Sequence, residues 1–210
     1  ESKGWASSLH VHRRRGSSLA TREFPLEPRQ VERIETAYRR IVTPIPVPES
    51  IPILQKLRDA EPRSMGGQPP VIWDSGEGSF IRDPYGNQWI DFSSGVLVTS
   101  VGHHHPRVVA AIRDTAEKHL YHAYCFPTDV RARLVEKLSS LMPPPLHRVF
   151  LLTTGSEAVE CAIKLAKTRA MARGETQRRV IVGFDNAFHG RTMGSQLAGG
   201  IPGLKTWIGC

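Results

Sequence analysis

The chain has 210 residues, of which 40% are hydrophobic and 23% charged, as in a globular protein with a sizeable core. No stretch approaches the roughly 20 consecutive apolar residues of a membrane helix, so no membrane span is expected. The net charge of +8 suits nucleic-acid binding, but aromatic residues do not alternate with the basic ones, so no nucleic-acid partner is expected.

Residues 1–26 are predicted to form a disordered leader, because large apolar side chains are scarce there. This Ser/Arg-rich segment loosely resembles a transit peptide, and translated upstream sequence is another alternative. The three cysteines lie far apart, which suggests neither a disulfide framework nor a metal site and fits a reducing compartment. We therefore expect a cytoplasmic protein, with the mitochondrion as the alternative. The chain begins with Glu1 and stops at Cys210 after an apolar-rich stretch, so both ends are expected to be cuts.

Residues 27–70 are predicted to form a helix followed by an extended arm. Within 27–41, apolar residues recur near helical spacing, at Val31, Ile34, Tyr38 and Ile41. The prolines that follow fit neither a helix interior nor a central strand, and they are Pro44, Pro46, Pro48 and Pro52. An arm of this kind often lies on a partner surface.

Residues 71–105 are predicted to form an antiparallel segment of a small domain. Strands are expected at 71–73, 79–82 and 88–92. The sequence Asp-Pro-Tyr-Gly-Asn at 83–87 is typical of a turn, because proline sets φ and Gly or Asn accepts positive φ.

Residues 106–210 are predicted to form the first part of an α/β domain. Pro106 suits the first position of a helix, and a second helix is expected over 129–141 with Thr128 as its cap. Apolar strands at 149–152 and 180–184 flank a helix at 155–173. This β-α-β order favours a mostly parallel sheet, which is expected to be incomplete.

The turn that opens the helix at 155 is the most informative segment. Thr154 and Glu157 have the spacing of a capping box, which leaves the N–H groups of Gly155 and Ser156 facing outward. These groups and the helix dipole suit a phosphate, at the end of a strand where open α/β sheets bind ligands. The alternative is a capped helix that binds nothing.

Three segments resemble the class III aminotransferases, the family that contains ornithine and 4-aminobutyrate aminotransferases. They are DFSSG…GHHHP at 91–106, FLLTTGSEAVECAIKLAK at 150–167 and AFHGRT at 187–192, and the resemblance covers roughly 45–210. It implies fold type I, with pyridoxal 5'-phosphate as the cofactor. It also implies transfer of an amino group from an amine or amino acid, often a terminal amine, to a 2-oxo acid. A homodimer with active sites at the subunit boundary is implied as well.

The resemblance also assigns roles to residues. Gly155 and Ser156 are implied to bind the cofactor phosphate, and Phe188 to stack on the pyridine ring, a role that suits a flat apolar side chain. Phe188 could instead belong to the core. His189 could orient the cofactor or hydrogen-bond its own loop. Candidates for the substrate pocket are Val96 and Leu97.

The catalytic residues of the family are not found in this chain. Transamination needs a lysine that forms a Schiff base with the cofactor, and an acidic partner for the pyridine nitrogen. The family places both beyond 187–192, and no lysine here has that context. The chain alone is therefore expected to be inactive. The alternatives are an aminomutase or other pyridoxal-phosphate reaction on the same fold, or a non-catalytic fragment. No metal is expected, because the adjacent side chains of 103–105 diverge.

Overall fold

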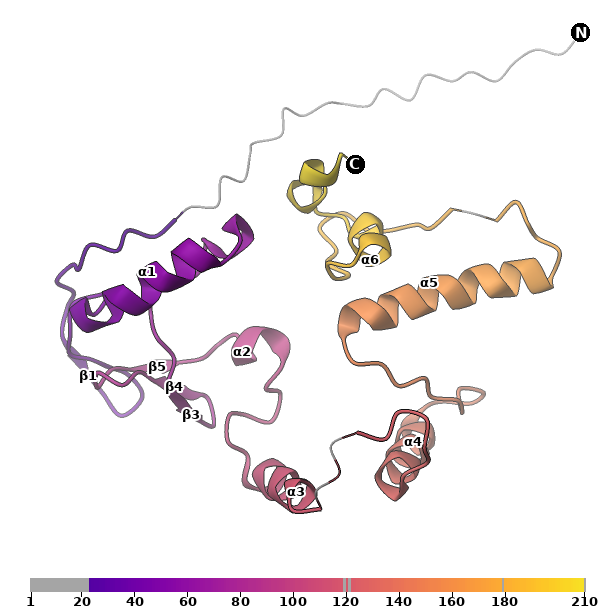
Figure 1. The fold of residues 1–210 in the computed structure, drawn as a ribbon, viewed down its shortest axis with the longest axis horizontal. Coiled ribbons are helices and arrows are strands. Elements are labelled where there is room, and N and C mark those ends of the chain that lie inside the picture. The colour runs from indigo at the N-terminus through magenta and orange to yellow at the C-terminus, as the bar shows by residue number, and fades with distance from the viewer. Residues whose placement is uncertain (1–22, 119, 121, 179, 210) are drawn as a thin grey trace, which may run out of the picture. The chain divides into compact units, whose positions relative to one another are not determined.

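A computed structural model describes residues 23–118, 120, 122–178 and 180–209 (Figure 1). These residues form two compact units, an amino-terminal unit up to Pro127 and a carboxyl-terminal unit from Thr128. Most of the predicted leader, 1–22, lies outside the described residues, and 23–26 have no regular structure. In the described part of the chain, no helix combines the length and the apolarity needed to cross a membrane.

An antiparallel sheet of five strands lies in the amino-terminal unit, in the order β1-β2-β5-β4-β3. Its central hairpin pairs Ile81 with Trp89, and Ile81 is among the buried apolar residues of this unit. The strands are β1 Ile34–Glu35, β2 Arg40–Ile41, β3 Ser75–Glu77, β4 Phe80–Arg82 and β5 Gln88–Ile90. The predictions of an antiparallel segment and of strands near 79–82 and 88–92 are therefore confirmed.

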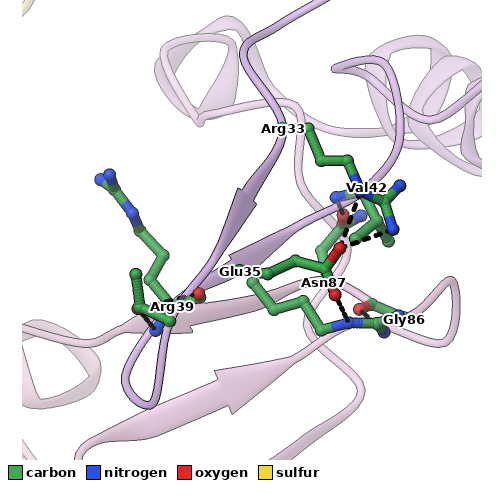
Figure 2. Close-up of polar contacts among 8 residues, drawn as sticks. Arg33, Glu35, Arg39, Val42, Gly86 and Asn87 are labelled. Atoms are coloured by element: carbon green, nitrogen blue, oxygen red, sulfur yellow. Dashed lines mark hydrogen bonds and ion pairs between the residues drawn. The ribbon is translucent and has the colours of Figure 1, made fainter.

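The turn between β4 and β5 is held by its own polar side chains. Asp83 Oδ1 accepts hydrogen bonds from the N–H groups of Tyr85 and Asn87, at 3.0 and 2.8 Å. Gly86 has a φ of 93°, which glycine adopts without steric cost. Asn87 also accepts a 2.8 Å hydrogen bond from the N–H of Val42, which ties the turn to the chain after β2 (Figure 2). The predicted turn at 83–87 is confirmed.

The predicted helix over 27–41 is wrong, because β1 and β2 form a hairpin there. The hydroxyl of Thr36 accepts a 2.9 Å hydrogen bond from the N–H of Arg39, which stabilises the hairpin turn. Ile34 then pairs with Ile41 across the hairpin instead of sharing a helix face with it. Glu35 also contacts Arg33 from this hairpin (Figure 2). Pairing of β2 with β5 provides hydrogen-bond partners that outweigh the weak helical pattern.

The predicted extended arm is also partly wrong. A 3-10 turn, η1 Pro48–Ser50, leads directly into helix α1 Ile51–Ala60, and a second 3-10 turn, η2 Arg63–Met65, follows. Pro52 is accommodated because the first turn of a helix has no use for its missing N–H group. Val47 is buried with 5% of its surface exposed, so this segment contributes to the core. The strand expected at 71–73 is displaced to β3.

Two further helices complete the amino-terminal unit. Helix α2 Ser94–Leu97 is a single turn, and helix α3 Pro106–Ala116 begins at the predicted proline. The start of α3 is therefore confirmed.

Helices dominate the carboxyl-terminal unit. Helix α4 Asp129–Leu141 is capped by Thr128, whose hydroxyl accepts from the N–H of Arg131, as predicted. Helix α5 Gly155–Ala172 ends before Gly174, which has a φ of 71°, so this prediction is confirmed too. Helix α6 Met193–Ala198 contacts α5. Two 3-10 turns follow, η3 Pro202–Leu204 and η4 Thr206–Ile208.

The strands expected at 149–152 and 180–184 do not form in this structure. Both segments lack regular secondary structure, and neither pairs with a strand among the described residues. Their side chains are largely exposed, 69% for Phe150 and 83% for Val182. Apolar strands need neighbouring backbone for their hydrogen bonds and apolar cover for their faces, and the described residues of this unit provide neither.

Candidate functional site

The tip of α5 carries the predicted capping box. Thr154 Oγ1 accepts a 3.2 Å hydrogen bond from the N–H of Glu157, and Glu157 Oε2 accepts a 2.9 Å one from the N–H of Thr154. The carboxylate also accepts from the hydroxyl of Thr153. This hydroxyl is the main cause that lowers the pKa of Glu157 below its usual value. The charge of Glu157 is therefore turned back toward the start of the helix.

The hydrogen-bond donors at this tip that the capping box does not use are those that a phosphate requires. The N–H groups of Gly155 and Ser156 have no acceptor among the described residues. A side chain at position 155 would meet no atom within 4 Å, so the space outside Gly155 is open. Ser156 Oγ accepts a 3.2 Å hydrogen bond from the N–H of Arg191, which leaves the Ser156 proton available to donate. Two amides, a hydroxyl and the positive end of a long helix form a suitable anion site.

The segment 187–192 lies directly against this tip. Gly190 is buried, with a φ of 119°, and a Cβ on it would overlap with Ser156 Oγ and lie 2.8 Å from Ser156 Cβ. The glycine thus permits a backbone approach that no other residue would allow. Together with the hydrogen bond from Arg191, this contact joins two motifs that are 35 residues apart in the sequence.

The other predicted residues of this segment are close to that contact. Phe188 is 60% exposed, so its ring belongs to no packed core here. A cavity of about 10 Å³ beside Phe188 is too small to hold a cofactor. His189 is half-buried and hydrogen-bonds no described residue, so it does not fasten the loop in this structure.

The predicted pocket residues Val96 and Leu97 lie in the amino-terminal unit, on α2. This turn is left-handed, with φ of 63° at Val96 and 67° at Leu97. Such a run costs roughly 1–2 kcal/mol per residue in non-glycine positions, so the surrounding contacts must impose it. Val96 is 77% and Leu97 87% exposed. The structure therefore presents both side chains on the surface of their own unit.

Asp91 is the residue that imposes the left-handed turn, and the sequence reasoning missed it. Its carboxylate accepts from Ser93 Oγ at 2.6 Å and from the N–H of Gly95 at 2.7 Å. Nε2 of His103 lies 2.8 Å from Oδ2, and the Asp91 side chain is only 2% exposed. The Ser93 hydroxyl, followed by His103, holds the pKa of Asp91 well below its usual range. The Asp-x-Ser spacing of a local Asp turn was the available signal.

A second residue that sequence reasoning missed is Glu160, one turn along α5 from Ser156. Its carboxylate accepts hydrogen bonds from Thr192, at the end of the segment 187–192, and from the N–H of Gly194 at the start of α6. The spacing of four residues from Ser156 places both on one helix face, which was the available signal. In the described residues, no group of three or more His, Cys, Asp or Glu side chains could hold a metal ion.

Comparison with known proteins bears on these motifs directly. Residues 63–206 match the family model of the aminotransferases of class III. This range covers more than half of the chain and includes the α5 tip and the segment 187–192. The chain belongs to the class III aminotransferase family.

Individual members of the family show how much of a protein the chain represents. It is 37% identical over 135 residues to acetylornithine aminotransferase of Mesorhizobium japonicum, covering 62% of this chain and 32% of that protein. It is 36% identical over 156 residues to 4-aminobutyrate aminotransferase of Mycobacterium leprae, covering 73% of this chain and 34% of that protein. The chain thus spans about a third of the length of these class III relatives.

A solved structure agrees with this assignment. The chain is similar to a PMP-bound aminotransferase from Vibrio fluvialis, with a TM-score of 0.62 and 29% identity, covering 75% of this chain and 33% of that one. The predicted fold class, that of fold type I transaminases, is therefore confirmed.

Proposed function

We propose that the protein containing this chain transfers an amino group from an amine or amino acid to a 2-oxo acid, with pyridoxal 5'-phosphate as its cofactor. A terminal amine is a suitable donor, because the relatives include acetylornithine and 4-aminobutyrate aminotransferases. Their names favour amino transfer over an aminomutase reaction. The observation that carries the proposal is the contact of Ser156 with Gly190 and Arg191, since it joins the turn at the α5 tip to the loop that contains Phe188.

Each candidate residue receives a role from its position. The amides of Gly155 and Ser156 and the Ser156 hydroxyl would hold the phosphate at the positive end of α5. Phe188 would cover one face of the pyridine ring with its exposed side, and His189 beside it would orient the cofactor. When bound, pyridoxal phosphate supplies a ring that stabilises negative charge on the reacting carbon. The residues of this chain then act by binding and orientation.

The remaining predictions extend this proposal. Val96 and Leu97, both exposed, would line the substrate pocket. We assign neither the reactive lysine nor the acidic partner of the ring nitrogen to a residue of this chain. Lys164 and Lys167 on α5 are exposed. We also propose that 71–105 belongs to a small domain and 106–210 to the cofactor-binding domain, in a cytoplasmic homodimer.

Ligand titration of the 210-residue chain tests the binding half of the proposal. Pyridoxamine 5'-phosphate and inorganic phosphate serve as probes, since neither needs a reactive lysine. Saturable binding of both is expected, and Ser156→Ala should weaken both. Phe188→Ala should weaken only pyridoxamine phosphate, by about 2-fold to 10-fold, because ring stacking contributes about 0.5–1.5 kcal/mol.

The control variant is Phe126→Ala, which removes an exposed ring from the amino-terminal unit, 73% exposed against 60% for Phe188. Failure of the chain to bind either probe, or equal binding by the Phe188→Ala and Phe126→Ala variants, would contradict the assigned roles. The reaction itself is tested on the protein expressed from its whole reading frame, by amine-dependent consumption of a 2-oxo acid. Absence of that turnover with a panel of terminal amines and amino acids would contradict the proposed activity.

A further inference from the structure

Glu160 connects the helix that carries the phosphate-binding tip to the segment that carries Phe188. Its Oε1 accepts a 2.7 Å hydrogen bond from Thr192 Oγ1, a 2.8 Å one from the N–H of Gly194 and a 3.1 Å one from the N–H of Ser195. A Cβ on Gly194 would overlap with the Glu160 carboxylate, so the backbone approaches as closely as glycine permits. Three donors therefore converge on one oxygen of a side chain that lies 32 to 35 residues earlier.

This carboxylate replaces the usual cap of α6. The first amides of any helix lack acceptors within the helix, and a Ser, Thr or Asp just before it normally supplies one. Thr192 occupies that position, but its side chain accepts no hydrogen bond from α6 amides. Its hydroxyl is instead directed to Glu160 and Ser195. The start of α6 thus depends on a group from another helix.

The same contact limits the movement of Phe188. On one side of it, the N–H of Asn186 donates to Gly200 O at 3.0 Å, and the N–H of Gly200 donates to Ala187 O at 2.8 Å. On the other side, Arg191 is bound to Ser156 and Thr192 to Glu160. Only residues 188–190 lie between these two attachments. The position of the ring relative to the α5 tip is therefore set by the two contacts that α5 makes, from Ser156 and Glu160.

We propose that Glu160 is a positioning residue for the cofactor, which holds the ring-bearing loop 188–192 at a fixed distance from the phosphate-binding tip of α5. This inference rests on the proposed function, because it assigns the tip and the loop to the phosphate and the ring of one ligand. The ligand gains affinity from both ends only when the spacing between them is set before it binds. The pKa of Glu160 agrees with the role: the Thr192 hydroxyl, followed by the Ser195 N–H, lowers it, so the group is a charged acceptor at neutral pH.

The test compares Glu160→Ala and Glu160→Gln with the wild-type chain. Glutamine keeps an oxygen that can accept from Gly194 and Ser195, whereas alanine keeps none. The matched control is Glu136→Ala, which removes an exposed carboxylate from α4 in the same unit. Two quantities are measured, the hydrogen exchange of the 190–198 backbone and the dissociation constants of pyridoxamine 5'-phosphate and inorganic phosphate.

Glu160→Ala is expected to lower the affinity for one of the two probes and not for the other. Glu160→Ala should speed exchange at the Gly194 and Ser195 amides about tenfold and weaken pyridoxamine phosphate about tenfold, since a charged acceptor is lost. Affinity for inorganic phosphate should stay within about twofold, because the α5 tip keeps its own capping box. Glu160→Gln should show smaller changes than Glu160→Ala in both amide exchange and pyridoxamine phosphate affinity, and Glu136→Ala should match the wild type.

The outcomes separate this inference from the proposed function. Wild-type binding of both probes with unchanged pyridoxamine phosphate affinity in Glu160→Ala would overturn the positioning role alone. An equal loss of both probes in that variant would also overturn it, because Glu160 would then support only the stability of the unit. Wild-type chain that binds neither probe would overturn the proposed function, and the positioning role with it.

Discussion

Replacing Gly190 by alanine is the most direct test of how the two motifs meet. The residue has a φ of 119°, a conformation that side-chain-bearing residues adopt at a cost of about 1–3 kcal/mol. In addition, the new Cβ would overlap with Ser156 Oγ and lie 2.8 Å from Ser195 Oγ, and Ser195 is fully buried. Overpacking of this kind costs about 1–3 kcal/mol. The variant is therefore expected to lose about 2–6 kcal/mol in the carboxyl-terminal unit.

Gly174→Ala separates the two contributions. Gly174 also has a positive φ, 71°, but a Cβ there would meet no atom within 4 Å. It should therefore show the backbone cost alone, and its melting temperature should exceed that of Gly190→Ala by about 4 °C or more. Thermal unfolding followed by circular dichroism measures the difference. Pyridoxamine phosphate binding should fall only in Gly190→Ala.

Equal melting temperatures for the two variants would refute the reasoning. They would mean that Ser156 moves aside at no cost, so that the contact with Gly190 does not hold α5 and the 188–192 loop together. Unchanged pyridoxamine phosphate affinity in Gly190→Ala would lead to the same conclusion.

Three further predictions concern the scaffold around the proposed site. Asn87→Ala removes hydrogen bonds to Val42, Thr43 Oγ1 and Asp83 from a side chain that is 1% exposed, and should cost about 3 kcal/mol in urea unfolding; a loss below that of an exposed-residue variant would contradict it. Thr154→Ala should destabilise α5 by about 1 kcal/mol in a thermal melt, because the cap is lost, unlike a mid-helix threonine-to-alanine change. The lowered pKa of Asp91 means that its stabilising effect is complete above the ordinary carboxyl pKa and is lost as the pH falls through the lowered value. Asp91→Asn should accordingly flatten the acid dependence of Trp73 fluorescence below about pH 4, and an unchanged profile would count against the turn contacts.

The elements predicted correctly are those whose signals lie within a few residues of each other. The capping box of Thr154 and Glu157, the cap at Thr128 and the Asp-Pro-Tyr-Gly-Asn turn each satisfy their own backbone groups. Such contacts form whatever the rest of the chain does, so their residue types predict them. The capped tip of α5, where phosphate binding is proposed, was accessible to sequence reasoning for the same reason.

The failures share a different cause. The 27–41 segment forms a hairpin because β2 pairs with β5, where Arg40 meets Gln88 far along the chain. The segments 149–152 and 180–184 are apolar, as strands are, but strand formation depends on a neighbour that a local pattern does not specify. In both cases hydrogen-bond partners distant in the sequence decide the backbone conformation.

The amino-acid sequence by itself determined the family motifs, the capped helix with two free amides at its tip, and the aromatic residue at 188. Only the tertiary structure decided that Ser156 touches Gly190 and that Glu160 caps α6, because both contacts join residues more than 30 positions apart. It likewise decided that Asp91, in contact with His103, imposes a left-handed turn at Val96 and Leu97. Local hydrogen bonds can be predicted from the types of neighbouring residues. The distance between two motifs depends on tertiary packing, which a local sequence pattern does not specify.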